Sequence, residues 1–182
     1  ADALEAVRKQ CANPQQHLVL PLDMSDSAAV PAAVQQVLAT LGRIDVLINN
    51  AGISQRSLVQ DTALEVDRRI MEVDFFGPVA LTKAVLPHLL AQRSGQLVAV
   101  SSVVGVVATP YRSAYAAAKH AIIGFYDALR AEVFAAGIGV SVILPGYVRS
   151  NVSLSALTGD GSAHVSVSAC CSAVCRPLCW HG

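Results

Sequence analysis

The stretch Ile44-Asp45-Val46-Leu47-Ile48-Asn49-Asn50-Ala51-Gly52 decides the fold, because a short apolar run passes directly into small and polar residues. Three other runs are similarly rich in Val, Ile and Leu and show little alternation: His17–Leu22, Gln96–Ser101 and Gly139–Leu144. Strands that are covered on both faces have this composition. All four runs are therefore predicted to be strands of a parallel sheet.

Helical patterns separate the predicted strands. The apolar positions of residues 30–41 follow the 3.6-residue period, and Ser25 or Asp26 can cap this helix. Two longer helices are predicted over Asp67–Ala91 and Tyr111–Ala136. Strands that alternate with helices predict an α/β fold, here a doubly wound parallel sheet with helices on both faces.

Composition excludes several classes of function. The chain has 182 residues, of which 53% are hydrophobic and 14% charged, and its formal net charge is zero. Lys and Arg never form a run, so we expect no nucleic-acid partner. The most apolar stretch, Leu97–Ala108, is shorter than the roughly 20 residues that span a bilayer, so we expect no membrane span.

The cysteines divide the chain at its C-terminal end. Cys11 stands alone in residues 1–162, which indicates a reduced, intracellular domain, whereas four cysteines crowd residues 163–182. The spacing of these four lacks the paired C-x-x-C motif of structural zinc sites, so no metal is expected. We predict that residues 163–182 are a divergent, disordered tail.

Four short motifs follow the predicted elements in a fixed order. Asn49-Asn50-Ala51-Gly52 follows one strand, and Ser101-Ser102 follows the next. Tyr115-Ala116-Ala117-Ala118-Lys119 and Pro145-Gly146 come after them. Each motif is common by itself, but together and in this order they resemble the classical short-chain dehydrogenase/reductase family. Within that family, residues 49–155 look most like the member 7 group, particularly its 7B type.

The resemblance implies a Rossmann-like fold and a catalytic set of Ser102, Tyr115 and Lys119. Lys119 lies four residues after Tyr115 and hence one turn away on the same helix face. A cation at that position favours the phenolate form of the tyrosine, which then exchanges protons more readily. By resemblance, Lys119 also holds ribose hydroxyls of a cofactor, and the Ser102 hydroxyl binds the substrate oxygen.

A nicotinamide cofactor, NAD or NADP, is implied by the same resemblance. Residues 50–52 lie at the carboxyl end of a strand, where open α/β sheets bind ligands. The alternative for these residues is a plain turn, and the alternative for Asp23 is a helix cap. The implied cofactor contacts are Asp23, Met24, Asn50, Ala51, Gly52, Tyr115, Lys119, Pro145, Gly146, Val148 and Ser150.

Asp74 is the fourth predicted catalytic residue. It stands where classical members usually have Asn, in a helix irregularity that supports a proton-relay water beside the lysine. The relay uses the main-chain carbonyl, so Asp can preserve the water. Its carboxylate can instead pair with Lys119 and weaken the other roles of that lysine. A capping or solvent-exposed role is the third alternative.

Compared with the family, the sequence lacks the first two strands, the last strand and the Gly-rich turn that cradles the pyrophosphate. We therefore expect a partial sheet in which the strand Ile44–Ile48 has an open, apolar edge. His17–Leu22 is expected either to lack a neighbour or to slide in beside Ile44–Ile48. The missing neighbours would leave buried backbone N–H and C=O groups unpaired. Because each such group lowers the free energy of unfolding, we predict that the isolated chain has low stability.

Two functions follow from these observations. The first is an NAD(P)-dependent oxidoreductase that interconverts an alcohol and a ketone or aldehyde on a lipid-, steroid- or retinoid-like substrate. Val103, Val104, Val106 and Tyr147 are expected to line its apolar pocket. The alternative is an inactive, truncated isoform that binds a full-length partner through helices 67–91 and 111–136, the helices of an expected homodimer. By resemblance, the parent protein is associated with the endoplasmic reticulum membrane, through an anchor that this sequence lacks.

Overall fold

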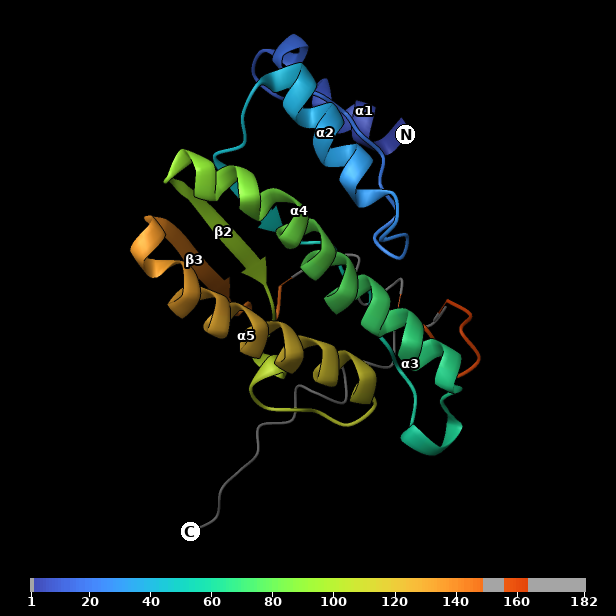
Figure 1. The fold of residues 1–182 in the computed structure, drawn as a ribbon. Helices are drawn as coiled ribbons and strands as arrows, with labels where there is room; N and C mark the ends of the chain where they lie inside the picture. Colours follow the sequence, from blue (N-terminus) through green and yellow to red (C-terminus); the bar gives the residue numbers. More distant parts are fainter. Residues whose placement is uncertain (1, 149–155, 164–182) are drawn as a thin grey trace.

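A computed structural model describes residues 2–148 and 156–163. Its centre is a parallel three-stranded sheet of β1 (Val46–Asn49), β2 (Gly95–Val100) and β3 (Ile138–Ile143), arranged in that order (Figure 1). The register places Leu47, Leu97 and Val140 side by side. Three of the four predicted strands are thus confirmed, and so is the Rossmann-like α/β class.

The helices agree with the predicted periodicity. The α-helices are α1 (Asp2–Arg8), α2 (Val30–Leu41), α3 (Leu64–Met71), α4 (Gly77–Gln92) and α5 (Ser113–Val133). A π-helical turn, η3 (Glu72–Phe76), joins α3 to α4, so the helix predicted from Asp67 is one continuous helical run that begins at Leu64. Short 3₁₀ turns occur at η1 (Pro14–Gln16), η2 (Val59–Asp61), η4 (Val103–Gly105) and η5 (Phe134–Ala136).

The hydrophobic core lies between the sheet and α2, α4 and α5. Leu97 and Ala99 of β2 are buried there, and α4 and α5 run side by side over this face (Figure 1). On the opposite face, Val46 and Ile48 are 53% and 60% exposed. The sequence predicted helices on both faces. In the part of the chain that the structure describes, the core helices cover one face and leave the other largely open.

The segment His17–Leu22 is not a strand, so this prediction is wrong. Among the described residues it pairs neither with β1 nor with any other strand. Its first residues instead line a small cavity of about 290 Å³ beside α1. Composition correctly identified an apolar segment, but a strand also requires a neighbour that accepts and donates its backbone hydrogen bonds.

The helical run Leu64–Gln92 has 29 residues and is long and apolar enough to cross a membrane by length and composition. The expectation of no membrane span rested on unbroken apolar stretches, and this helix contains polar residues between its apolar ones. Here Ile70, Val85 and Leu89 are buried, and the run packs against the sheet and α5. These contacts make it a core helix.

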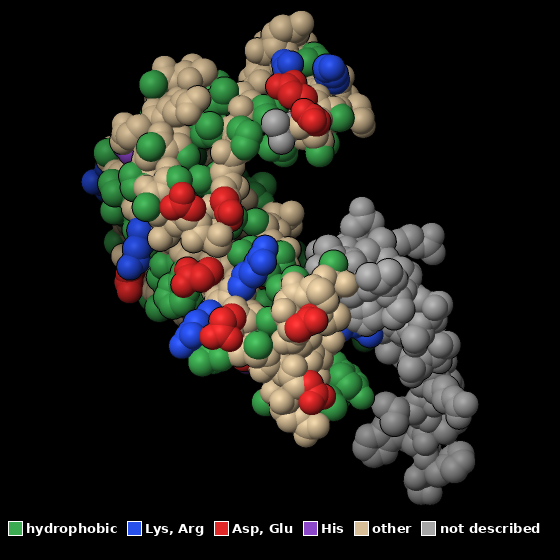
Figure 2. Space-filling view, turned by 90° about the vertical axis from the view of Figure 1, so that its right-hand side faces the viewer, with side chains coloured by type: hydrophobic (Ala, Val, Ile, Leu, Met, Phe, Trp, Pro, Cys, Tyr) green, Lys and Arg blue, Asp and Glu red, His purple; other side chains and the backbone are tan. Residues whose placement is uncertain are grey.

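Charged side chains of both signs are interspersed over the face shown in Figure 2. Several form pairs of opposite charge at the surface: Arg43–Asp45, Arg68–Glu65, Arg130–Asp127 and the partly buried Arg8–Glu5. Exposed pairs of this kind contribute little to stability.

Candidate active site

A break in helical regularity positions Asp74. Residues Glu72–Phe76 form a π-helical turn between α3 and α4. Such turns insert an extra residue into a helix and are frequent at functional sites. Asp74 is buried within this turn. The helix irregularity implied by the family resemblance is therefore confirmed.

Asp74 and Lys119 form a buried ion pair. Asp74 Oδ2 lies 3.2 Å from Lys119 Nζ, and the two side chains are 0% and 6% exposed. Asp74 Oδ1 accepts a hydrogen bond of 2.8 Å from the backbone N–H of Ile53. Burial raises the pKa of the Asp74 carboxyl, and the opposing effects of Lys119 and Ile53 are smaller. Among the alternatives left open by the sequence, the structure shows the pair with Lys119.

Gly52 makes room for this ion pair. A Cβ atom on Gly52 would lie 3.0 Å from Asp74 Oδ2 and 3.2 Å from Lys119 Nζ. Both distances are closer than ordinary van der Waals contact, so a side chain here would push the two groups aside. Gly52 is one of the cofactor contacts implied by the family resemblance, and the structure shows in addition that it lies close to the charged pair.

Lys119 and Tyr115 of α5 lie near the end of β2, and Ser102 lies in the turn that follows this strand. Lys119 Nζ lies 5.6 Å from the centroid of the Tyr115 ring and donates a hydrogen bond of 3.3 Å to the carbonyl of Val100. Ser102 follows β2, and its Oγ accepts the Val104 N–H at 3.2 Å. Val104 and Tyr115 share a small buried cluster, which joins the Ser102 turn to α5.

A cleft of about 710 Å³ includes Gly52 in its lining. Its lining residues are Leu22, Asp23, Met24, Ser25, Ala51, Gly52, Ile53, Arg69, Glu72 and Val73. Four of them are predicted cofactor residues: Asp23, Met24, Ala51 and Gly52. A single cleft thus gathers residues from the turn before α2, from the loop after β1 and from the helical run Leu64–Gln92.

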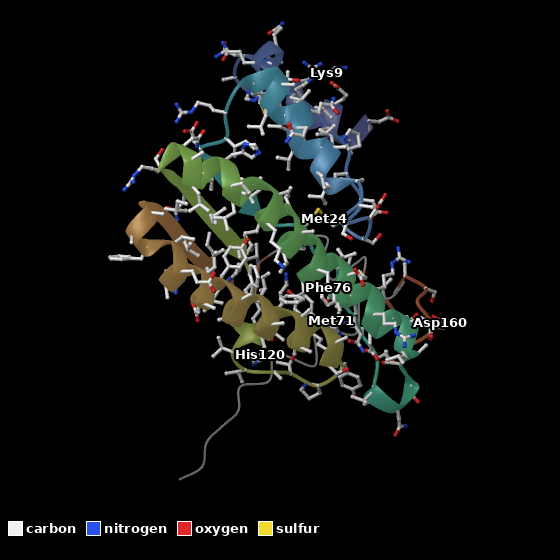
Figure 3. The ribbon with its side chains drawn as sticks, viewed as in Figure 1. Lys9, Met24, Met71, Phe76, His120 and Asp160 are labelled. Carbon is white, nitrogen blue, oxygen red and sulfur yellow. The ribbon has the colours of Figure 1, made fainter. Side chains whose placement is uncertain are left out.

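Asp23 and Met24 form one wall of this cleft. The Asp23 carboxylate accepts hydrogen bonds from the N–H and hydroxyl of Ser25, and these bonds lower the pKa of Asp23. Asp26, rather than Asp23, accepts the backbone N–H groups just before α2. Met24 lies beside the start of α4 (Figure 3), where its carbonyl occupies the space that a Cβ on Gly77 would need.

The remaining predicted cofactor residues are more dispersed. The Pro145 carbonyl accepts the Val103 N–H at 3.1 Å, which ties the loop after β3 to the Ser102 turn. Asn50, Gly146 and Val148 are exposed and do not line the cleft. Ser150 lies outside the described residues.

The sequence reasoning missed several residues. Arg69, Glu72 and Val73 line the cleft, and their spacing of three and four positions could have placed them on one helix face. Arg112 was also missed, and its guanidinium lies 5.9 Å from the centroid of the Tyr115 ring.

Asn49 has a structural role that the sequence did not reveal. Its Nδ2 donates to Thr82 Oγ1 at 3.0 Å, to the Tyr126 hydroxyl at 2.7 Å and to the Pro78 carbonyl at 3.3 Å. Burial raises the pKa of Tyr126. These partners are distant in sequence, so no local pattern points to them.

Residues 1–159 match the family model for short chain dehydrogenase. Dehydrogenase/reductase SDR family member 7B of Mus musculus is 46% identical over 167 residues, which are 89% of this chain and 52% of that protein. The Xenopus laevis protein of the same name is 51% identical over 148 residues, 81% of this chain and 46% of that protein. The chain therefore spans about half the length of these relatives.

Solved structures agree with the sequence matches. A short-chain dehydrogenase from Streptomyces avermitilis has a TM-score of 0.78 and 34% identity, covering 83% of this chain and 55% of its own. An NAD⁺-bound xylitol dehydrogenase has a TM-score of 0.74 and 29% identity, covering 80% and 57%. Both the family resemblance and the likeness to member 7B are thus confirmed. The chain belongs to the short-chain dehydrogenase family.

Proposed function

We propose that this chain carries the reactive part of an NAD(P)-dependent oxidoreductase that interconverts an alcohol and a ketone or aldehyde. The observation that carries the proposal is the buried contact of Tyr115 with the Lys119 ammonium, beside the turn that holds Ser102. Gly52 lines the cleft of about 710 Å³ and also lies next to the same ammonium.

Each residue of the site has a distinct proposed role. When bound, the nicotinamide cofactor supplies or accepts the hydride. The Tyr115 hydroxyl donates a proton to the carbonyl oxygen in reduction and accepts one in oxidation. Lys119 stabilises the resulting phenolate by its charge. The Ser102 hydroxyl donates a hydrogen bond to the substrate oxygen, where negative charge develops.

The residues present fit parts of a dinucleotide. An ammonium has three N–H donors. One N–H of the Lys119 ammonium is directed to the Val100 carbonyl and a second faces Asp74. The third N–H is left for a ribose hydroxyl. The cleft of about 710 Å³ falls within the usual range of ligand sites. We propose that Asp23 and Met24 hold the adenine end. The similar xylitol dehydrogenase is bound to NAD⁺, which supports a nicotinamide cofactor for this chain. Both NAD and NADP are candidates.

An apolar substrate is proposed from the surface next to Ser102. Val103 and Val106 of the following turn are exposed, and Tyr147 in the neighbouring loop is 87% exposed. Val104, the fourth residue expected to line the pocket, is buried and belongs to the core. Exposed apolar side chains around a reactive site favour lipid-, steroid- or retinoid-like carbonyl compounds.

The test is cofactor binding followed by turnover. The full chain is titrated with NADH and NADPH while fluorescence transfer is measured, and then assayed with an apolar ketone. Tyr115→Phe should lower kcat by about 100-fold or more, because the proton donor is removed. Tyr111→Phe, at an exposed tyrosine outside the site, is the matched control and should retain activity.

Two outcomes would contradict the proposal. Full activity of Tyr115→Phe would exclude the tyrosine as the acid and base. No cofactor binding, together with co-purification of a full-length partner, would favour the alternative of an inactive isoform that pairs through the helices 67–91 and 111–136.

A further inference from the structure

We propose that Asp74 is a positioning residue that holds the Lys119 ammonium against the Gly52–Ile53 turn and neutralises part of its charge. The catalytic consequence of this inference rests on the proposed function, because it concerns the lysine that is paired there with Tyr115. The restraint itself is a property of the protein without any cofactor and is testable separately.

A single carboxylate joins two parts of the fold. Asp74 Oδ2 faces Lys119 Nζ on α5 at 3.2 Å, and Oδ1 accepts the Ile53 N–H of the loop after β1 at 2.8 Å. Among the described residues, Oδ2 makes no hydrogen bond to any other group, so the Lys119 ammonium is its partner. Asp74 therefore links α5, which carries Tyr115 and Lys119, to the loop that lines the cleft.

Space around the pair leaves the ammonium little freedom. On one side, Gly52 approaches so closely that a Cβ would lie 3.2 Å from Nζ. On another side, Nζ donates to the Val100 carbonyl at 3.3 Å. With the carboxylate on a third side, the lysine is held in one position before any ligand arrives. Removal of the carboxylate should release this restraint.

The charge of Asp74 also acts on the tyrosine. Lys119 Nζ lies 5.6 Å from the Tyr115 ring centroid, and a cation there favours the phenolate. A carboxylate 3.2 Å from the same nitrogen opposes this effect, and in a buried site such charges are weakly screened. Asp74 therefore weakens the electrostatic support that the Lys119 ammonium gives to a negative charge on Tyr115.

Other charged groups lie near this pair. Arg69 and Glu72 on the same helical run line the cleft, as does Asp23 on its opposite wall. The Arg112 guanidinium lies 5.9 Å from the Tyr115 ring centroid. The loop Asn50–Ile53 contributes no titratable side chain. Asp74 is the only one of these carboxylates in an ion pair with Lys119 among the described residues.

The experiment compares Asp74→Asn with Asp74→Ala in the full chain. Asparagine keeps an oxygen for the Ile53 N–H and removes the charge, whereas alanine removes both. Alcohol oxidation is measured from pH 5 to 10. The pH of half-maximal kcat should fall by about one unit in Asp74→Asn, with KM for the alcohol changing less than kcat. Asp67→Asn removes another carboxylate from α3 and is the matched control, with an unchanged profile.

A cofactor-free measurement separates the two proposals. The unfolding equilibria of Asp74→Asn, Lys119→Gln and the double variant form a double-mutant cycle. We expect a coupling of about fivefold or more in the unfolding equilibrium constant, because the side chains touch. If the wild type shows no turnover, the proposed function fails, and the double-mutant cycle alone tests the restraint of Lys119 by Asp74. Coupling between the two substitutions supports the restraint, and additive effects overturn it. If turnover occurs and Asp74→Asn keeps the wild-type pH profile, the inference is overturned while the proposed function stands.

Discussion

The two faces of the sheet both carry branched apolar residues and have different surroundings. On one face, Leu97 is 0% exposed and Ala99 and Val140 are buried beneath α4 and α5. On the other face, Val46 and Ile48 are more than half exposed. An apolar strand therefore specifies which side chains can be buried, whereas the surrounding elements determine which ones are.

The largest expected effect is the loss of packing on the covered face. Leu97→Ala should lower the free energy of unfolding by about 2–5 kcal/mol, because it removes buried methyl groups and leaves a cavity under α4 and α5. Urea unfolding followed by circular dichroism measures the change. A loss below about 1 kcal/mol would show that this face is not the tightly packed one.

The buried polar network on the covered side gives the next effect. Tyr126→Phe removes the hydroxyl that accepts from Asn49 Nδ2 and pairs with Thr82 Oγ1 at 2.7 Å. The stability should fall by about 1–3 kcal/mol, because polar atoms remain buried without this partner. Phe125→Leu is a useful comparison, since Phe125 lies on the same helix and only packs against the core. A Tyr126→Phe variant as stable as the wild type would mean that the network contributes nothing.

A pH effect at Asp74 is expected to be smaller. Burial raises the pKa of Asp74 in the folded chain above its ordinary value of 3.8. A folded-state pKa that is raised means that the folded state binds the proton more tightly. This contribution to stability is complete below about pH 3.8 and is lost as the pH rises through the folded-state pKa. Each unit of the shift corresponds to about 1.4 kcal/mol.

The measurement is the difference in unfolding free energy between the wild type and Asp74→Asn from pH 3 to 7. The wild type should lose stability relative to the variant as the pH rises through this window. A difference that stays constant with pH would contradict the raised pKa.

The smallest effect is expected on the open face. Ile48→Thr should change the stability by about 0.5 kcal/mol or less, because the side chain is already 60% exposed. The same substitution should reduce self-association in light scattering, since exposed apolar edge strands promote it. A loss as large as that of Leu97→Ala would show that this face is covered in solution.

The sequence predicted the elements that depend on local pattern. The runs around Val46, Leu97 and Val140 were identified as strands, and they formed because each has a parallel neighbour. His17–Leu22 is similarly apolar but contains Pro21, which cannot donate a backbone hydrogen bond, and it has no strand neighbour among the described residues. The open face escaped prediction because coverage depends on other segments.

In the candidate site, too, local features could be predicted from the sequence, whereas features that depend on distant segments could not. The spacing of Tyr115 and Lys119 follows from helix geometry, and the structure places the ammonium near the ring. Family resemblance supplied the helix irregularity at Asp74. The choice between its carboxylate and its carbonyl required coordinates, because it depends on the approach of Gly52 and Ile53 from another element.

The side chain of Asn49 ties β1 to α4 and α5 through partners 33 and 77 positions along the chain. Contacts between such distant residues form slowly during folding, since the intervening loops must close first. The hydrogen bond from Asn49 to α5, the helix that carries Tyr115 and Lys119, therefore forms only when β1, α4 and α5 have come together. We therefore expect Tyr115 and Lys119 to reach their folded positions late in folding, after these loops have closed.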